Sequence, residues 1–300
     1  MPAAPQVVAQ QARIRSMQRA IQRQARTSTR WLCAAGLAVA STSALAQQAA
    51  AFRFSDLDLR DPHLFVQVIG CNDITNPSLL PFSVNGELQT RIQTDADGDG
   101  RLDLSYLVEF LPLDRTQPTN LMDFGGAECS APLASTECTQ VIVSALAGDA
   151  TLGPGTACLA PLPGTVRPYS PAVAAPSAPC FVSPAGTLTL DLGGIPITLR
   201  EVALSASFVG NPGDALANGL LRGFISEADA DATILPAGLP LVGGRPLSSL
   251  LPGGTGNCAA FSDKDMLDGT SGWWFYFNFP ATRVPLLDPF ADGFADGFEP

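Results

Sequence analysis

Apolar and polar residues alternate along several segments of the chain, and this period of two is typical of β-strands with one buried face. Between residues 102 and 110 every even position is apolar or aromatic. Residues 273–279 are aromatic at every position except Asn278, which indicates a strand covered on both faces. Further strands are expected at residues 64–69, 141–143, 188–192, 197–199 and 202–208.

Two short helices interrupt this pattern. Ser83 is a suitable N-cap for a helix at residues 84–92, whose apolar residues recur every fourth position. Ser226 begins a Ser-x-x-acid pattern, and Pro236 limits the length of the helix that follows. The sequence therefore predicts a mainly β fold, an antiparallel β-sandwich-like domain with a few short helices and long Pro/Gly-rich loops.

The chain divides into a leader, a domain and a tail. Six arginines and no acidic residue precede an apolar run at residues 31–40, and Ala44-Leu45-Ala46 follows that run. A basic start, an apolar middle and an Ala-x-Ala end are the parts of a secretory signal, here residues 1–46. The run is too short to cross a bilayer, which needs about 20 residues, although a membrane anchor and a mitochondrial transit peptide remain alternatives.

We therefore expect a secreted, periplasmic or cell-surface protein with no transmembrane segment in its mature chain. The domain spans residues 47–287, and a Pro-, Ala- and Gly-rich loop at residues 148–184 could subdivide it. Residues 288–300 form a flexible acidic tail.

Removal of the leader shifts the charge. Six of the 17 basic residues are lost and all 28 acidic residues stay, so 11 bases face 28 acids and the net charge is about −17. Such a field repels nucleic acid and favours bound cations, so we expect no nucleic-acid partner.

The cysteine content agrees with export. Six cysteines follow the leader, and an even number in an oxidising compartment indicates up to three disulfides. Sequence alone does not fix their pairing, and free buried thiols are the alternative. We favour Cys129–Cys138 and Cys158–Cys180 as local pairs, with Cys71–Cys258 joining distant parts of the domain.

The strongest chemical signal is the acidic stretch at residues 95–103. The spacing is that of an EF-hand-type calcium loop, in which alternate residues point at one cation and a glycine allows the sharp turn. The expected Ca²⁺ ligands are Asp95, Asp97, Asp99, the carbonyl of Arg101 and Asp103. A merely solvated acidic turn is the alternative.

This loop departs from a full EF-hand at its twelfth position, where Tyr106 replaces the usual glutamate. Glu109, or a carboxylate from elsewhere, would complete the shell, and a Kd of roughly 0.1–1 mM is expected for so few ligands. Residues 263–269 are a weaker candidate for a second cation site, and residues 227–231 weaker still.

Signatures of catalysis are mostly missing. The chain contains one histidine, His63, and no Gly-x-Ser-x-Gly or His-Glu-x-x-His motif. A structural or exposed role for His63 is therefore expected. A pair of carboxylates can hydrolyse glycosides, which keeps a secreted hydrolase as the alternative function.

Several segments resemble uncharacterised secreted bacterial proteins. These are the Asp-x-Asp-x-Asp-Gly loop with its strand, residues 221–229, and Gly-Trp-Trp-Phe-Tyr at residues 272–276. The Asp-Gly-Phe-Glu ending is similar to tails that recur on exported bacterial proteins. This resemblance implies export and no particular activity.

We expect a calcium-braced binding, adhesion or structural module of the bacterial envelope or extracellular space rather than an enzyme, with an unknown protein or glycan partner. A protein that binds an apolar ligand in a large cavity is a further possibility.

Overall fold

The computed structural model describes residues 49–287, apart from residues 79, 81, 154, 192–194 and 212. The predicted signal peptide and the acidic tail lie outside the described residues. The helices in this part are α2 (Val84–Gln93) and α3 (Glu227–Ala232), with 3₁₀ turns at Leu133–Ser135 and Leu247–Leu250. The strands are β1 (Ala50–Phe54), β2 (Asp58–Asp61), β3 (Phe65–Val68), β4 (Gly70–Asp73), β5 (Tyr106–Phe110), β6 (Thr119–Gly126), β7 (Val143–Thr151), β8 (Cys180–Val182), β9 (Gly186–Asp191), β10 (Pro196–Val209), β11 (Ala215–Ser226), β12 (Asp265–Leu267) and β13 (Thr270–Val284).

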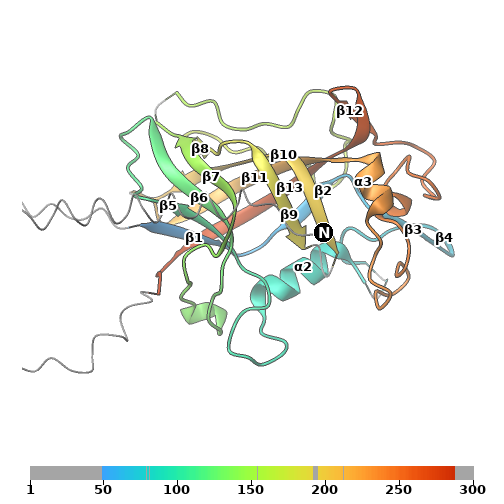
Figure 1. The fold of residues 1–300 in the computed structure, drawn as a ribbon, viewed down its shortest axis with the longest axis horizontal. Coiled ribbons are helices and arrows are strands. Elements are labelled where there is room, and N and C mark those ends of the chain that lie inside the picture. Colours follow the sequence, from blue (N-terminus) through green and yellow to red (C-terminus); the bar gives the residue numbers. More distant parts are fainter. Residues whose placement is uncertain are drawn as a thin grey trace, which may run out of the picture. The chain divides into compact units, whose positions relative to one another are not determined.

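The mainly β composition is confirmed, but the predicted sandwich is wrong: eight antiparallel strands close into a β-barrel (Figure 1). The ring runs β1-β5-β6-β7-β8-β10-β11-β13, and β13 pairs back onto β1 from Ala51 opposite Val284 to Phe54 opposite Ala281. Alternation shows which face of a strand is buried, in a sandwich and in a barrel alike. It does not show whether the two edge strands pair with each other, and here they do.

Strand boundaries differ from the pattern where the backbone bends. β10 unites two predicted strands, and the register shift between Arg200 and Ala203 coincides with a left-handed Glu201 at φ 50°. β5 begins later than the alternation suggests. The preceding amides of Asp103 and Leu104 donate to carbonyls at the end of α2 instead of to a neighbouring strand.

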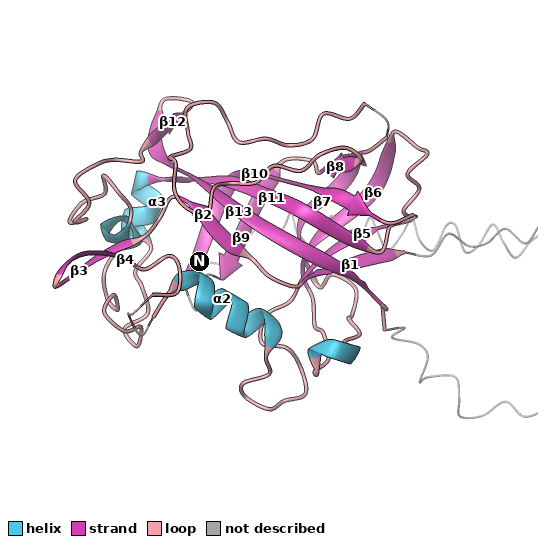
Figure 2. Cartoon of the chain, turned by 180° about the vertical axis from the view of Figure 1, so that it is seen from behind, coloured by secondary structure: helices cyan, strands magenta, loops and turns pink. Residues whose placement is uncertain are grey.

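Side chains fill the interior of the barrel. Stacked and edge-to-face rings from different strands meet there, with centroids 4.0 Å apart for Phe54 and Phe279 and 6.1 Å apart for Phe52 and Phe110. Helix α2 joins the same core through its buried apolar face, and Ser83 caps it by accepting a hydrogen bond from the Gly86 amide, as predicted. Figure 2 shows α2 alongside the barrel, with α3 and the β3–β4 hairpin at the end remote from β5 and β6.

Two further apolar clusters cover parts of the outer wall. One lies over β1 and β5 and includes the Cys129–Cys138 pair. The other lies where the segment at residues 155–179 crosses β11 and β13, burying Trp274 and Tyr276 on the face opposite Phe275 and Phe277. The predicted double coverage of the aromatic strand is therefore confirmed.

Three disulfides form the predicted pairs. Cys71–Cys258 links residues 187 positions apart, whereas Cys129–Cys138 and Cys158–Cys180 close short loops. The last of these joins the two ends of the Pro-rich segment, which contains no helix or strand among its described residues from 155 to 179.

Candidate metal centre

The acidic loop connects the end of α2 to the start of β5, and hydrogen bonds hold its two ends together. The Asp103 amide donates to the Thr94 carbonyl at 3.0 Å, and the Leu104 amide donates to the Arg91 carbonyl at 2.9 Å. Gly98 and Gly100 have φ of 76° and 86°, a left-handed backbone that favours glycine. These two positions let the chain reverse within the loop, as the spacing predicts.

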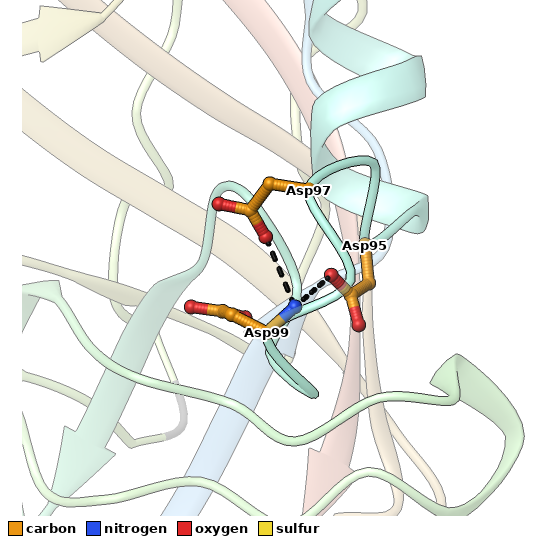
Figure 3. Close-up of side chains that lie close together, drawn as sticks. All are labelled: Asp95, Asp97 and Asp99. Carbon is orange, nitrogen blue, oxygen red and sulfur yellow. Dashed lines mark hydrogen bonds between the residues drawn. The ribbon is translucent and has the colours of Figure 1, made fainter.

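Three of the predicted ligands converge. One carboxylate oxygen from each of Asp95, Asp97 and Asp99 lies within 4.8 Å of the other two, and Figure 3 shows the three side chains around the turn. Two oxygens bound to the same Ca²⁺ lie at most about 5 Å apart, twice the Ca–O distance of about 2.3–2.6 Å. Among the described residues, this triad is the one group of three potential metal-ligating side chains that meets such a separation. Its spacing and its all-oxygen donors fit Ca²⁺.

Backbone amides orient these carboxylates. Asp95 accepts from the amides of Gly98, Asp99 and Gly100 at 2.8–3.1 Å, and the Asp99 amide is also bonded to Asp97 (Figure 3). The Arg101 amide donates to Asp99 at 2.8 Å. The loop therefore presents its acidic side chains in fixed directions.

The remaining predicted ligands lie on the same loop but outside the triad. Asp103 accepts from the Ala96 amide at 3.0 Å, which binds the end of the loop to its beginning. Arg101, whose carbonyl is the predicted ligand, forms a side-chain ion pair with Glu128. Glu128, Asp97 and Asp99 line one depression of about 500 Å³, but Glu128 lies outside the group of converging carboxylates.

Tyr106, at the twelfth loop position, and Glu109, which was expected to complete the shell, both bind other groups. The Tyr106 hydroxyl is buried and accepts from the Asp191 amide at 3.1 Å. Glu109 lies buried on β5, where its carboxylate accepts from the Val141 amide at 2.9 Å. Burial raises the pKa of Glu109, as does the nearby charge of Asp123.

A covalently closed hairpin supports the loop from one side. The Leu102 amide donates to the Cys129 carbonyl at 2.9 Å, and the Ala131 amide donates to the Gly100 carbonyl at 2.8 Å. Cys129 is bonded to Cys138, whose amide in turn donates to the Pro285 carbonyl at 3.0 Å. The loop is thereby connected to the end of β13.

The two weaker acidic clusters are occupied by other partners. Asp263 accepts hydrogen bonds from the Arg167 guanidinium and the Tyr169 hydroxyl. In α3, Glu227 pairs with Lys264, and Asp229 pairs with Arg200 at 2.6 Å. Neither cluster supplies three converging ligand atoms among the described residues.

His63 is enclosed by neighbouring side chains. Its Nδ1 lies 2.5 Å from an Asp73 oxygen, and its ring stacks on Tyr169 with centroids 3.8 Å apart. Only 3% of the residue is exposed. His63 is thus inaccessible to a substrate in this structure.

A second polar site, at Asp61, was not predicted from the sequence. This carboxyl, with Arg167, Asp263 and Asp265, lines a cavity of about 260 Å³. Asp61 is 1% exposed, and burial, followed by the charges of Asp263 and Asp265, raises its pKa to about 8. A charged residue at a buried strand position was the available signal, because such a residue needs a partner.

Comparison with known proteins gave no family. No protein-family model matches the chain, and no match was found among curated proteins or solved structures. In the described part of the chain, no helix has both the length and the apolar character needed to span a bilayer.

Proposed function

We propose that the protein is an exported, calcium-braced binding, adhesion or structural module of the bacterial envelope or extracellular space. The observation that carries this proposal is the convergence of Asp95, Asp97 and Asp99 within 4.8 Å on a loop with two left-handed glycines. Three carboxylates at this separation repel one another, and a divalent cation among them would remove that repulsion.

The position of the loop explains why a cation would brace the fold. The loop is hydrogen-bonded to the end of α2 and to the hairpin closed by Cys129–Cys138, and the chain continues from it into β5. A bound Ca²⁺ would hold these elements at fixed distances, so its binding energy would add to the free energy of unfolding.

An exposed apolar surface adjoins the same loop. The depression beside Asp97 and Asp99 is also lined by Ile142 and Val143, which are 57% and 69% exposed. Exposed apolar side chains next to a rigid polar loop favour recognition of a protein or glycan. Three disulfides support an oxidising compartment for this role.

Thermal unfolding of the purified protein with calcium and with chelator tests the proposal. For a Kd of 0.1–1 mM, about 10 mM Ca²⁺ should add about 1.4–2.7 kcal/mol, or roughly 3–10 °C in Tm. Asp97→Asn should abolish this shift. Asp231→Asn, which removes an exposed charge outside the triad, should retain it.

Calorimetric titration with calcium provides the second measurement. Equal Tm values with calcium and with chelator, together with no binding heat at millimolar calcium, would show that the loop is a solvated turn.

A further inference from the structure

One edge of β13 is interrupted at the centre of the aromatic strand. β12 pairs with this edge at residues 270–272, and β2 pairs with it at residues 276–278. Between them, no strand of the described residues pairs with this edge at residues 273–275, and the Trp274 amide donates to the Asp265 carboxylate instead. Asp61 and Asp265 thus stand on the two sides of an opening in the outer wall.

The Pro-rich segment crosses this opening and is fastened there by carboxyl groups. The Arg167 amide donates to Asp61 at 2.6 Å, and the Arg167 guanidinium bonds to Asp263. Tyr169 also donates to Asp263. A cavity of about 260 Å³ remains between these groups.

The segment is held independently on either side of this stretch. The Leu159 amide donates to Ser205 at 3.3 Å, and Ala174 exchanges two hydrogen bonds of 2.8 Å with the Asn278 side chain. Cys158–Cys180 closes the segment covalently. Movement at residues 162–173 therefore leaves both ends in place.

Asp61 is the one carboxyl in this group that is buried without a cationic partner among the described residues. The Arg167 guanidinium hydrogen-bonds to Asp263, and the hydrogen bond that Asp61 accepts comes from the neutral Arg167 amide. The guanidinium charge lowers the pKa of Asp61, but less than burial raises it. Its ionised form would lie in a buried site beside two other carboxylates. Burial and like charge oppose ionisation and together outweigh the hydrogen bond from the Arg167 amide, which favours the ionised form. Other titratable and charged side chains surround Asp61. They belong to its own turn, the crossing segment, the 262–265 turn and β13, and they are His63, Arg167, Tyr169, Asp263, Lys264, Asp265 and Tyr276.

We propose that Asp61 is a proton-operated latch for residues 162–173: with its carboxyl protonated the segment stays packed on β13, and with its carboxyl ionised the segment loosens. The segment covers Phe224, Trp274 and Tyr276 through Leu162 and Val173. Loosening therefore uncovers an aromatic face of the barrel at higher pH. This inference is independent of the calcium proposal, because none of these residues belongs to the 95–103 loop.

The direction of the pH effect follows from linkage. The pKa of Asp61 is raised to about 8 in the closed state, mainly by burial, from the ordinary value of 3.8. The closed state therefore binds the proton more tightly than the open state. The proton therefore stabilises the closed state fully below the pKa of the open state. As pH rises towards the pKa of the closed state, the ratio of closed to open molecules falls by up to about tenfold per pH unit.

Amide hydrogen exchange of the disulfide-bonded protein, corrected for the intrinsic pH dependence of exchange, tests the latch. Protection at residues 162–173 should fall between about pH 5 and about pH 8 and then level off, while protection of the barrel strands stays constant. Asp61→Asn mimics the neutral carboxyl and should make protection independent of pH. Asp58→Asn, on the same strand with a side chain 27% exposed, should behave like the wild type.

Two outcomes would overturn the proposal. One is constant protection of the wild-type segment from about pH 5 to about pH 9. The other is an Asp61→Asn protein with the wild-type pH dependence. Should Asp61→Asn fail to fold, Asp265→Asn is the second variant. It removes a like charge, so the fall in protection should level off at a lower pH, and an unchanged profile would again contradict the latch.

Discussion

Replacement of Arg53 by methionine should remove the main connection between the barrel wall and the ends of the acidic loop. Arg53 lies on the outward face of β1, because Phe52 and Phe54 beside it point into the barrel. The residue is 1% exposed, and burial lowers its pKa to about 10. Its guanidinium donates to the Ile92 carbonyl, to the Leu104 carbonyl at 3.2 Å and to Ser105 Oγ at 3.2 Å.

The expected cost follows from these contacts. The Ile92 carbonyl is near the C-terminus of α2, where the helix dipole favours a cation. Methionine would fill much of the space but would remove the donor from the buried Ile92 carbonyl and from the partly buried Leu104 carbonyl. An unpaired buried carbonyl costs about 1–3 kcal/mol. We therefore expect Arg53→Met to lower the free energy of unfolding by about 3–5 kcal/mol, and also to weaken calcium binding.

Urea unfolding at neutral pH measures this loss. Arg91→Met is the matched control, because Arg91 pairs with Asp191 at 2.8 Å and both side chains are partly exposed. Such a pair contributes about 0–1 kcal/mol. A loss for Arg53→Met no larger than that for Arg91→Met would refute the reasoning.

Two further substitutions concern the hairpin beside the loop. Glu128→Gln should weaken calcium binding several-fold in calorimetry relative to Glu137→Gln, because Glu128 shares the depression with Asp97 and Asp99; equal affinities would show that Glu128 is no ligand. Cys129→Ser combined with Cys138→Ser should lower the free energy of unfolding by about 2–3 kcal/mol in urea. It should also weaken calcium binding, since the hairpin pairs with Gly100 and Leu102, and an unchanged affinity would show that the loop needs no such support.

Local chemistry made several elements predictable from the sequence. Ser83 and Ser226 cap the helices that their patterns predict, and the alternation at β5 and the aromatic run in β13 mark real strands. The closed barrel was not predictable in the same way. It depends on the pairing of β1 with β13, more than 200 residues apart, which no local periodicity reports.

The candidate metal site was likewise predictable where its residues are close in sequence, and not where they are distant. The aspartate spacing predicted the convergence of Asp95, Asp97 and Asp99, because all three belong to one turn. Glu128 and the Asp61 site were missed, because their neighbours come from distant parts of the chain. Tyr106 looked like a vacant twelfth ligand position, whereas its ring packs beside Phe54 with centroids 6.0 Å apart.

The pairing of β13 with both β11 and β1 has a consequence for biogenesis. A chain that leaves the ribosome or a translocation channel from its N-terminus exposes β1 and β11 as open edges until β13 arrives. Open edges can pair with other chains, and contacts between distant residues form slowly. Until β13 is available, each molecule can therefore aggregate through these edges. A chaperone that covers the edges, or rapid delivery of the remaining residues, would favour closure of the barrel.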